Sequence, residues 1–192
     1  MSNKHFSLLV KTLELEERLA GSKLINFSLD NIEKDNKNKT WTFNFSGETL
    51  PLVDELTLLI QKLRESFMGD YVVNYRLKTS NIVTDEQIKE FWKYIILENF
   101  SEISQVLLES ILFSEIDVNN NVLTMKIMAP SIWNNFINER KQQIIGSYSN
   151  LGIAIKDIIP NFSKTDVEAV LESQEEKISQ EIVKLEEIDK KN

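Results

Sequence analysis

The side chains that most often carry catalysis are scarce in this chain of 192 residues. It has one histidine, His5, and no cysteine, so neither a histidine nor a thiolate nucleophile system can be assembled, and a metal ion would need oxygen ligands alone. The five glycines fit neither a phosphate-binding P-loop nor a dinucleotide-binding fingerprint. The acidic cluster of Glu14, Glu16 and Glu17 falls on a predicted helix surface, where a solvated charged face is the expected role. We therefore expect no catalytic residue, no metal ion and no cofactor in this region.

A basic and aromatic stretch, KDNKNKTWTFNF at residues 34 to 45, raises the alternative of nucleic-acid binding. Its candidate contacts are Lys34, Lys37 and Lys39. Bases would stack on aromatic side chains that lie beside such lysines on an open sheet face. Strand alternation instead places Trp41 and the two phenylalanines after it together on a face typical of a protein core. The formal net charge of -8 and the lack of the G-x-x-G loop of KH domains also favour a plain hairpin with solvated lysines.

Hydrophobic periodicity divides the first 80 residues into helix, strand, strand, helix and strand. A three-and-four spacing predicts a helix over residues 7–19, and alternation predicts a hairpin in which KLINFSLDNI pairs with TWTFNF. Pro51 suits the first turn of the next helix, whose apolar stripe ends at Phe67. In DYVVNYRLK, alternate residues from Tyr71 to Leu77 face the core, and the polar residues between them lie on the opposite face. The predicted unit is a three-stranded sheet with helices on one face.

A similar order recurs after residue 80, where we predict helix, helix, strand, strand, helix and strand. Thr84 and Gln87 form a capping box for the first of these helices. Three consecutive asparagines join two short strands, and Pro130 begins the last helix. The recurrence of hairpin, proline-initiated helix and strand suggests two related units in tandem, although a chance repeat of a common motif is the alternative.

We divide the chain into a first unit at 1–80, a second unit at 81–163 and an acidic helical linker at 164–192. The predicted fold class is α+β, with two tandem small units, each a short antiparallel or mixed sheet with helices on one face, followed by a charged helical tail. The N-terminal apolar run FSLLV is too short for a signal peptide, and nowhere do eighteen apolar residues stand together. We expect a cytoplasmic protein with no membrane partner.

The hairpin also carries a resemblance to a known family. The run DNKNKTWTFNF, followed by Leu50, Pro51 and a helix ending at Phe67, is similar to the start of the PolC-type alpha subunit of bacterial DNA polymerase III. The family's N-terminal domain I has this Asn-Lys-rich turn and Thr-Trp strand. The second half of the chain resembles the family's N-terminal domain II in its order of elements. The acidic tail resembles the linker that leads, in the family, to an OB domain and then to the PHP, exonuclease and polymerase parts.

The resemblance implies the noncatalytic N-terminal region of a DNA-directed DNA polymerase with 3'-5' exonuclease activity, because no polymerase or exonuclease motif can be placed in these residues. Domain I of the family looks like the KH-like domain of the clamp-loader tau subunit. The resemblance therefore implies a KH-like first unit that docks to tau or another replisome protein. We expect docking on the open face of the first sheet, through Asn44, Asn74, Arg76 and Lys78, because helices occupy the other face. A nucleic-acid-binding KH-like module within the polymerase is the alternative.

Overall fold

The computed structural model describes residues 3–67, 69, 71–100, 102–127 and 136–162. In it the predicted hairpin forms two of the three strands of the first sheet. Strands β1 (Ser28–Asp35) and β2 (Thr40–Gly47) are antiparallel, and β3 (Val72–Thr79) runs parallel to β2, in the order β1-β2-β3. The turn is closed by Asp35, whose Oδ1 accepts hydrogen bonds from the backbone N–H groups of Lys37 and Asn38 at 2.8 and 3.0 Å. An aspartate at this position explains why the chain reverses here.

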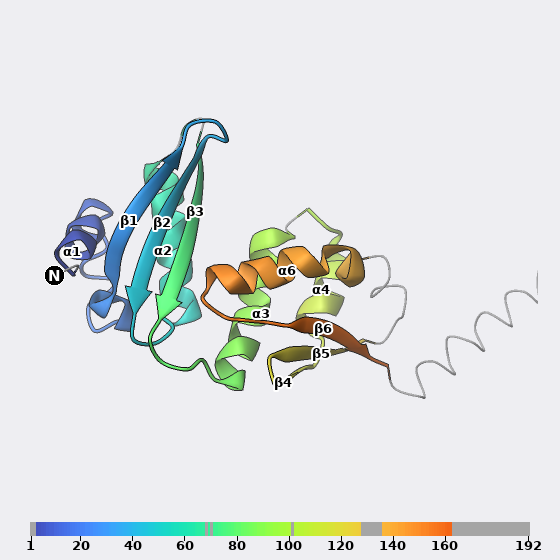
Figure 1. The fold of residues 1–192 in the computed structure, drawn as a ribbon. Coiled ribbons are helices and arrows are strands. Elements are labelled where there is room, and N and C mark those ends of the chain that lie inside the picture. Colours follow the sequence, from blue (N-terminus) through green and yellow to red (C-terminus); the bar gives the residue numbers. More distant parts are fainter. Residues whose placement is uncertain (1–2, 68, 70, 101, 128–135, 163–192) are drawn as a thin grey trace, which may run out of the picture.

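Helices cover one face of this sheet (Figure 1). Helix α2 (Val53–Ser66) crosses behind the sheet between β2 and β3, while α1 (Asn3–Thr12) lies beside β1. The strands bury one row of alternating side chains against these helices and expose the other row, as period-two alternation requires. The buried row includes Phe43, Phe45, Val73 and Leu77. Among the residues that the structure describes, no helix of the first unit lies on the other face of the sheet, which is open (Figure 1).

The structure corrects three details predicted for the first unit. Helix α1 ends at Thr12 rather than at residue 19, because the chain turns at Glu14, which has a φ of 55°. The segment Lys23–Asn26 is a short 3-10 helix rather than the start of a strand, and it leaves Ile25 exposed. Pro51 lies just before α2 rather than in its first turn, since the helix begins at Val53.

The core position predicted for Trp41 is only partly right. The indole is half-buried at the end of the core, 6.0 Å from the ring of Phe67 and 6.1 Å from that of Tyr71 between centroids. Phe43 and Phe45, the next two residues on the same face, are fully buried. The difference arises because α2 gives way to the loop before β3 at this end of the sheet, so less of the protein packs over Trp41.

The second unit contains α3 (Asp85–Asn99), α4 (Gln105–Leu112), β4 (Ile116–Asn119), β5 (Val122–Lys126), α6 (Asn138–Asn150) and β6 (Asp157–Asn161). Strand β4 is antiparallel to β5 and β6 is parallel to β5, which repeats the strand pairing of the first sheet. The predicted capping box is present, since Thr84 Oγ1 accepts from Gln87 N–H at 3.3 Å and Gln87 Oε1 accepts from Thr84 N–H at 3.0 Å. The described residues thus form an α+β fold with two three-stranded mixed sheets and five α-helices, which confirms the predicted α+β class with two small sheets.

Two predictions fall on residues outside those described. These are the helix start at Pro130 and the acidic helical linker at 164–192. The division of the chain into domains likewise stays a prediction. The two sheets nevertheless pack into one structure, because buried apolar side chains from both units form a single continuous cluster.

Polar contacts reinforce the packing of the two units. Arg64 of α2 forms an ion pair with Glu98 of α3, with 2.7 Å between Nη2 and Oε2. The hydroxyls of Tyr75 in β3 and Tyr94 in α3 are hydrogen-bonded at 2.7 Å. The second unit therefore lies against β3 and α2, and the surface of the first sheet that remains accessible is its open face together with the region around β1.

Candidate protein-docking face

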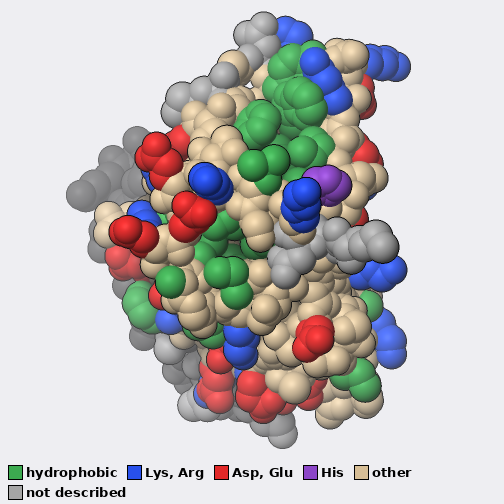
Figure 2. Space-filling view, turned by 90° about the vertical axis from the view of Figure 1, so that its left-hand side faces the viewer, with side chains coloured by type: hydrophobic (Ala, Val, Ile, Leu, Met, Phe, Trp, Pro, Cys, Tyr) green, Lys and Arg blue, Asp and Glu red, His purple; other side chains and the backbone are tan. Residues whose placement is uncertain are grey.

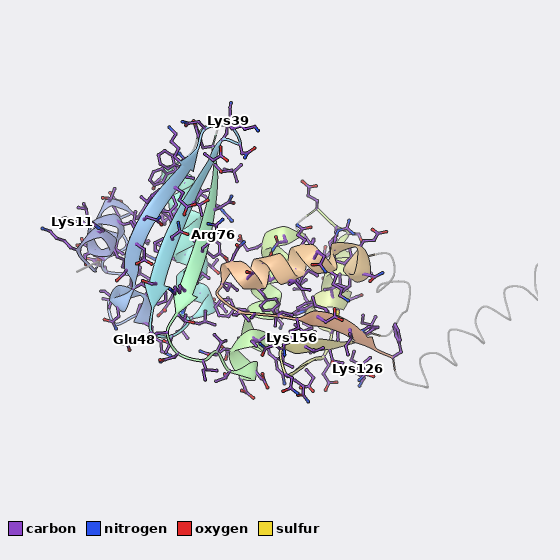
Figure 3. All side chains as sticks on the ribbon, in the orientation of Figure 1. Lys11, Lys39, Glu48, Arg76, Lys126 and Lys156 are labelled. Carbon is purple, nitrogen blue, oxygen red and sulfur yellow. The ribbon has the colours of Figure 1, made fainter. Side chains whose placement is uncertain are left out.

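The open face of the first sheet brings together two of the residues expected to bind a partner. Asn44 of β2 and Arg76 of β3 are direct neighbours in the parallel register. Both contact Glu33 of β1, which accepts a hydrogen bond from Asn44 Nδ2 at 2.9 Å and lies 3.5 Å from Arg76 Nη1. Figure 3 labels Arg76 on this sheet and Lys39 at the far end of the hairpin. The three side chains form one polar row across all three strands.

The other two predicted residues extend this row along β3. Asn74 lies beside Thr42 and Lys78 beside Ser46 in the same register, and both Asn74 and Lys78 are exposed. The hydroxyl of Ser46 donates to Asp30 Oδ1 at 2.8 Å. All four residues predicted for docking therefore share one face, as their alternation with buried residues indicated.

Glu33 connects the residues of this face, and it is not among the residues predicted from the sequence. Its place follows from the hairpin register, in which Asp35 pairs with Thr40 and Glu33 with Thr42. Counting outward from the turn would have placed the carboxylate next to Asn44. With Asp30 and Glu33 beside Arg76 and Lys78, the face carries both signs of charge. Such a face suits a polar protein surface better than a phosphate backbone.

The three hairpin lysines proposed as nucleic-acid contacts do not form one group. The ammonium of Lys34 lies on the helix-covered side of the sheet, 5.0 Å from the ring centroid of Trp41 and 4.9 Å from that of Tyr71. Lys37 is exposed within the turn, and Lys39 is exposed just before β2 with a φ of 51°. Because Lys34 packs on two aromatic rings, those rings do not offer both faces to a stacked base.

The pair of tyrosines between the two units is the most strongly perturbed titratable group near this face. Burial raises the pKa of Tyr75 to about 12, although the hydrogen bond with Tyr94 acts in the opposite direction. Burial is also the main cause that raises the pKa of Tyr94, and the charge and hydroxyl of Tyr75 act in the same direction. The shared hydrogen bond keeps these two hydroxyls satisfied at the junction. We interpret the pair as a structural contact that holds the second unit against β3.

This pair predicts a loss of stability at alkaline pH. An unfolded tyrosine ionises near pH 10, whereas folded Tyr75 keeps its proton up to about pH 12. Between these two pH values the folded state binds more protons than the unfolded state. The contribution of Tyr75 to the free energy of unfolding is therefore fully present below about pH 10 and is lost as the pH rises towards 12. Urea denaturation between pH 8 and 12 should show this decline, and the decline should be shallower in Tyr75→Phe. Equal pH dependence in the two proteins would contradict the assignment.

No helix within the described ranges is long and apolar enough to cross a membrane. In the same residues, no group of three or more histidine, aspartate or glutamate side chains could hold a metal ion. Comparisons with protein-family models, curated proteins and solved structures found no match to this chain.

Proposed function

We propose that this chain is the noncatalytic N-terminal region of a PolC-type DNA polymerase III alpha subunit, and that it docks to the clamp-loader tau subunit in the cytoplasm. In this proposal the first unit is a KH-like domain, and residues 164–192 are the charged tether towards the catalytic parts. Neither a catalytic residue nor a cofactor of its own is assigned to the region. The family assignment is supported by the DNKNKTWTFNF hairpin and by the order of elements after it.

The observation that carries the docking role is the open face of the first sheet. Within the described residues, helices cover one side of β1-β2-β3, and the other side presents the row of Glu33, Asn44 and Arg76. Its exposed groups include hydrogen-bond donors and acceptors as well as charges of both signs. This chemistry is typical of a partly polar and salt-sensitive protein interface.

Calorimetric titration of purified tau into the full chain tests the proposal. We expect saturable binding that Arg76→Glu weakens by about tenfold or more, because the new carboxylate faces Glu33 and removes the donor to it. Lys156→Glu is the matched control, since it makes the same change of charge at an exposed site on the second unit. The control should leave the affinity within about twofold of the unmodified chain.

Three other results would change the proposal. No binding of tau at tens of micromolar protein would remove tau as the partner. Equal weakening by Arg76→Glu and Lys156→Glu would remove the open face as the surface, because the effect would then be one of net charge. DNA binding that falls steeply with salt and is lost in Lys37→Glu would favour the nucleic-acid-binding alternative.

A further inference from the structure

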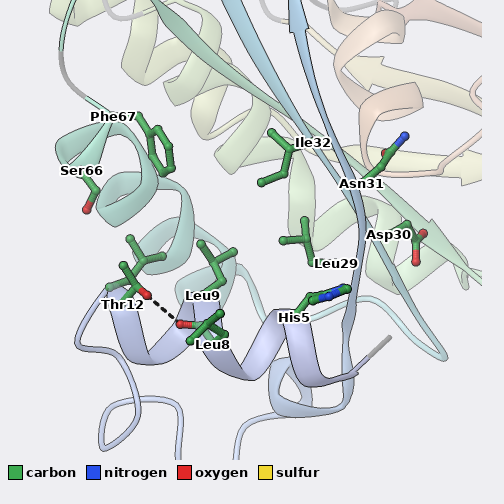
Figure 4. Close-up of a pocket in the computed structure, with 11 residues that line it drawn as sticks. His5, Leu8, Leu9, Thr12, Leu29, Asp30, Asn31, Ile32, Ser66 and Phe67 are labelled. Atoms are coloured by element: carbon green, nitrogen blue, oxygen red, sulfur yellow. Dashed lines mark hydrogen bonds between the residues drawn. The ribbon is translucent and has the colours of Figure 1, made fainter. Parts of the chain in front are cut away.

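A groove lies on the helix-covered side of β1, opposite the open face. It lies between α1, β1 and the end of α2, and its volume is about 600 Å³. Figure 4 shows its side chains converging from the three elements. The floor and walls are mainly apolar, and they include Leu8, Leu9, Leu29, Ile32 and Phe67. We name this feature the α1–β1 groove.

An irregularity in β1 creates the floor of the α1–β1 groove. In a regular strand, Leu29 and Ile32 would point to opposite faces, because they are three residues apart. The register with β2 shifts between Leu29 and Asn31, so one residue, Asp30, is unpaired in a β-bulge. Figure 4 shows Leu29 and Ile32 on the same side of β1, while Asp30 and Asn31 lie on the other side. The bulge thus adds an apolar side chain to the groove.

Apolar side chains in the α1–β1 groove are exposed to solvent. Leu8 is 62% exposed and Ile32 is 42% exposed. Figure 2 shows hydrophobic side chains gathered on this face of the molecule, next to the single histidine. A contiguous apolar surface of this kind marks a site for a partner more often than scattered exposed leucines do.

The rim of the α1–β1 groove is basic, although the chain has a net charge of -8. Lys4, Leu8 and Lys11 are spaced by four and three residues on α1, so the two lysines flank Leu8 along one stripe of the helix. Lys34 follows Ile32 by two residues on β1 and therefore lies on the same side of the strand. All three lysines are exposed. Figure 2 shows Lys or Arg side chains beside the hydrophobic group.

Two carboxylates near the α1–β1 groove are engaged elsewhere. Asp30 accepts the hydroxyl of Ser46 on the open face. Glu65, which precedes the groove residue Ser66, forms an ion pair with Lys62 at 2.7 Å. Neither of them neutralises the lysines on the rim through these contacts. An occupant that matches the groove therefore needs an apolar surface bordered by negative charge.

We infer that the α1–β1 groove binds an amphipathic helix of a partner protein that carries acidic residues beside its apolar stripe. Such helices insert anchor side chains at i, i+3 or i+4, and i+7 into apolar grooves, and the groove volume of about 600 Å³ has room for several of them. The acidic flanks meet Lys4 and Lys11 on one rim and Lys34 on the other. This surface is separate from the open face, so the inference stands independently of tau docking there.

Two designed peptides test the inference with the full chain. Both are helical peptides of about 18 residues with the same leucine stripe, one flanked by glutamates and the other by lysines. Fluorescence anisotropy should show saturable binding of the glutamate peptide, about tenfold or more tighter than binding of the lysine peptide. The variant Leu8→Asp should weaken binding of the glutamate peptide by about tenfold or more, because it places a negative charge in the apolar wall that α1 forms. The matched control is Leu97→Asp, at a leucine of α3 that is 50% exposed and lies outside the groove.

The lysines on the rim have their own test. Lys4→Glu should reduce the preference for the glutamate peptide over the lysine peptide, whereas Lys156→Glu on the second unit should leave this preference unchanged. Circular dichroism of each variant checks that the fold is retained. A loss of preference in both variants would show that net charge alone attracts the peptide, and it would overturn the inference.

The remaining outcomes decide between occupants. No saturable binding of the glutamate peptide, or equal affinity for both peptides, would overturn the inference. If light scattering detects a dimer of the unmodified chain and a monomer of Leu8→Asp, the groove binds a second copy of the chain instead. A synthetic peptide of residues 163–192 could bind the unmodified chain but not Leu8→Asp, while the designed peptides bind neither. This result would assign the groove to this chain's own acidic segment. Each of these results excludes a separate partner helix.

Discussion

Phe45→Ala is expected to remove a large share of the free energy of unfolding of the protein. The ring of Phe45 is 1% exposed and packs edge-on against Phe6 at 5.8 Å between centroids. In the sheet register, Phe45 lies between Leu29 of β1 and Leu77 of β3, both of which are buried. Truncating a phenylalanine in such surroundings costs about 3 to 5 kcal/mol through lost burial and the cavity that remains. Natural domains have only about 5 to 15 kcal/mol of unfolding free energy.

Urea denaturation followed by circular dichroism measures this loss, and Trp41→Ala supplies an internal comparison. Trp41 is on the same strand and the same face as Phe45, but it is half-buried at the end of the core. Its truncation should therefore cost less than that of Phe45, although tryptophan is the larger side chain. If Trp41→Ala were the more destabilising of the two, the order of burial along β2 would be wrong.

Local patterns were sufficient to predict the sheets. Alternation in TWTFNF and DYVVNYRLK indicated which residues face the core, and the asparagine- and aspartate-rich turns indicated the hairpins. These features depend on neighbours in the sequence, so they can be seen without a structure. The same reasoning placed Asn44 and Arg76 on one open face, where the structure has them as neighbours.

The features that sequence reasoning missed depend on contacts between distant residues. The β-bulge at Asp30 shows in SLDNIEKD only as two apolar residues three positions apart, a spacing that an exposed isoleucine on a regular strand would also give, yet the bulge moves Ile32 to the helix-covered side of β1. The α1–β1 groove then joins residues of α1, β1 and α2 that are far apart in the chain. Arg64 and Glu98 each look like solvated helix residues, and only the packing of α2 on α3 pairs them. Periodicity carries no information about such partners.

Gly152 lies at the junction between the two units, where both its backbone conformation and its close approach to β3 favour glycine. It ends α6 in a Schellman motif, in which Ile153 N–H donates to the Tyr148 carbonyl at 3.0 Å and Gly152 N–H donates to the Ser149 carbonyl at 2.9 Å. Its φ of 73° lies in the left-handed region that glycine adopts without strain. A Cβ added to Gly152 would lie 2.8 Å from the carbonyl oxygen of Leu77 in β3. This contact is to backbone, so it cannot be relieved by rotating a side chain.

Gly152→Ala is therefore expected to destabilise the protein by about 2 kcal/mol or more, from left-handed backbone strain of about 1 to 2 kcal/mol and from the contact with β3. The matched control is Gly146→Ala within α6, where an added Cβ meets no atom within 4 Å. Alanine in a helix interior is favoured over glycine by about 0.5 to 1 kcal/mol, so this control should be slightly more stable than the unmodified chain. The urea midpoint should therefore fall in Gly152→Ala and rise slightly in Gly146→Ala, although the chemical change is the same. If Gly152→Ala raised the midpoint as Gly146→Ala does, neither the left-handed strain nor the contact with Leu77 could be present at Gly152, and this structure of the junction would be contradicted.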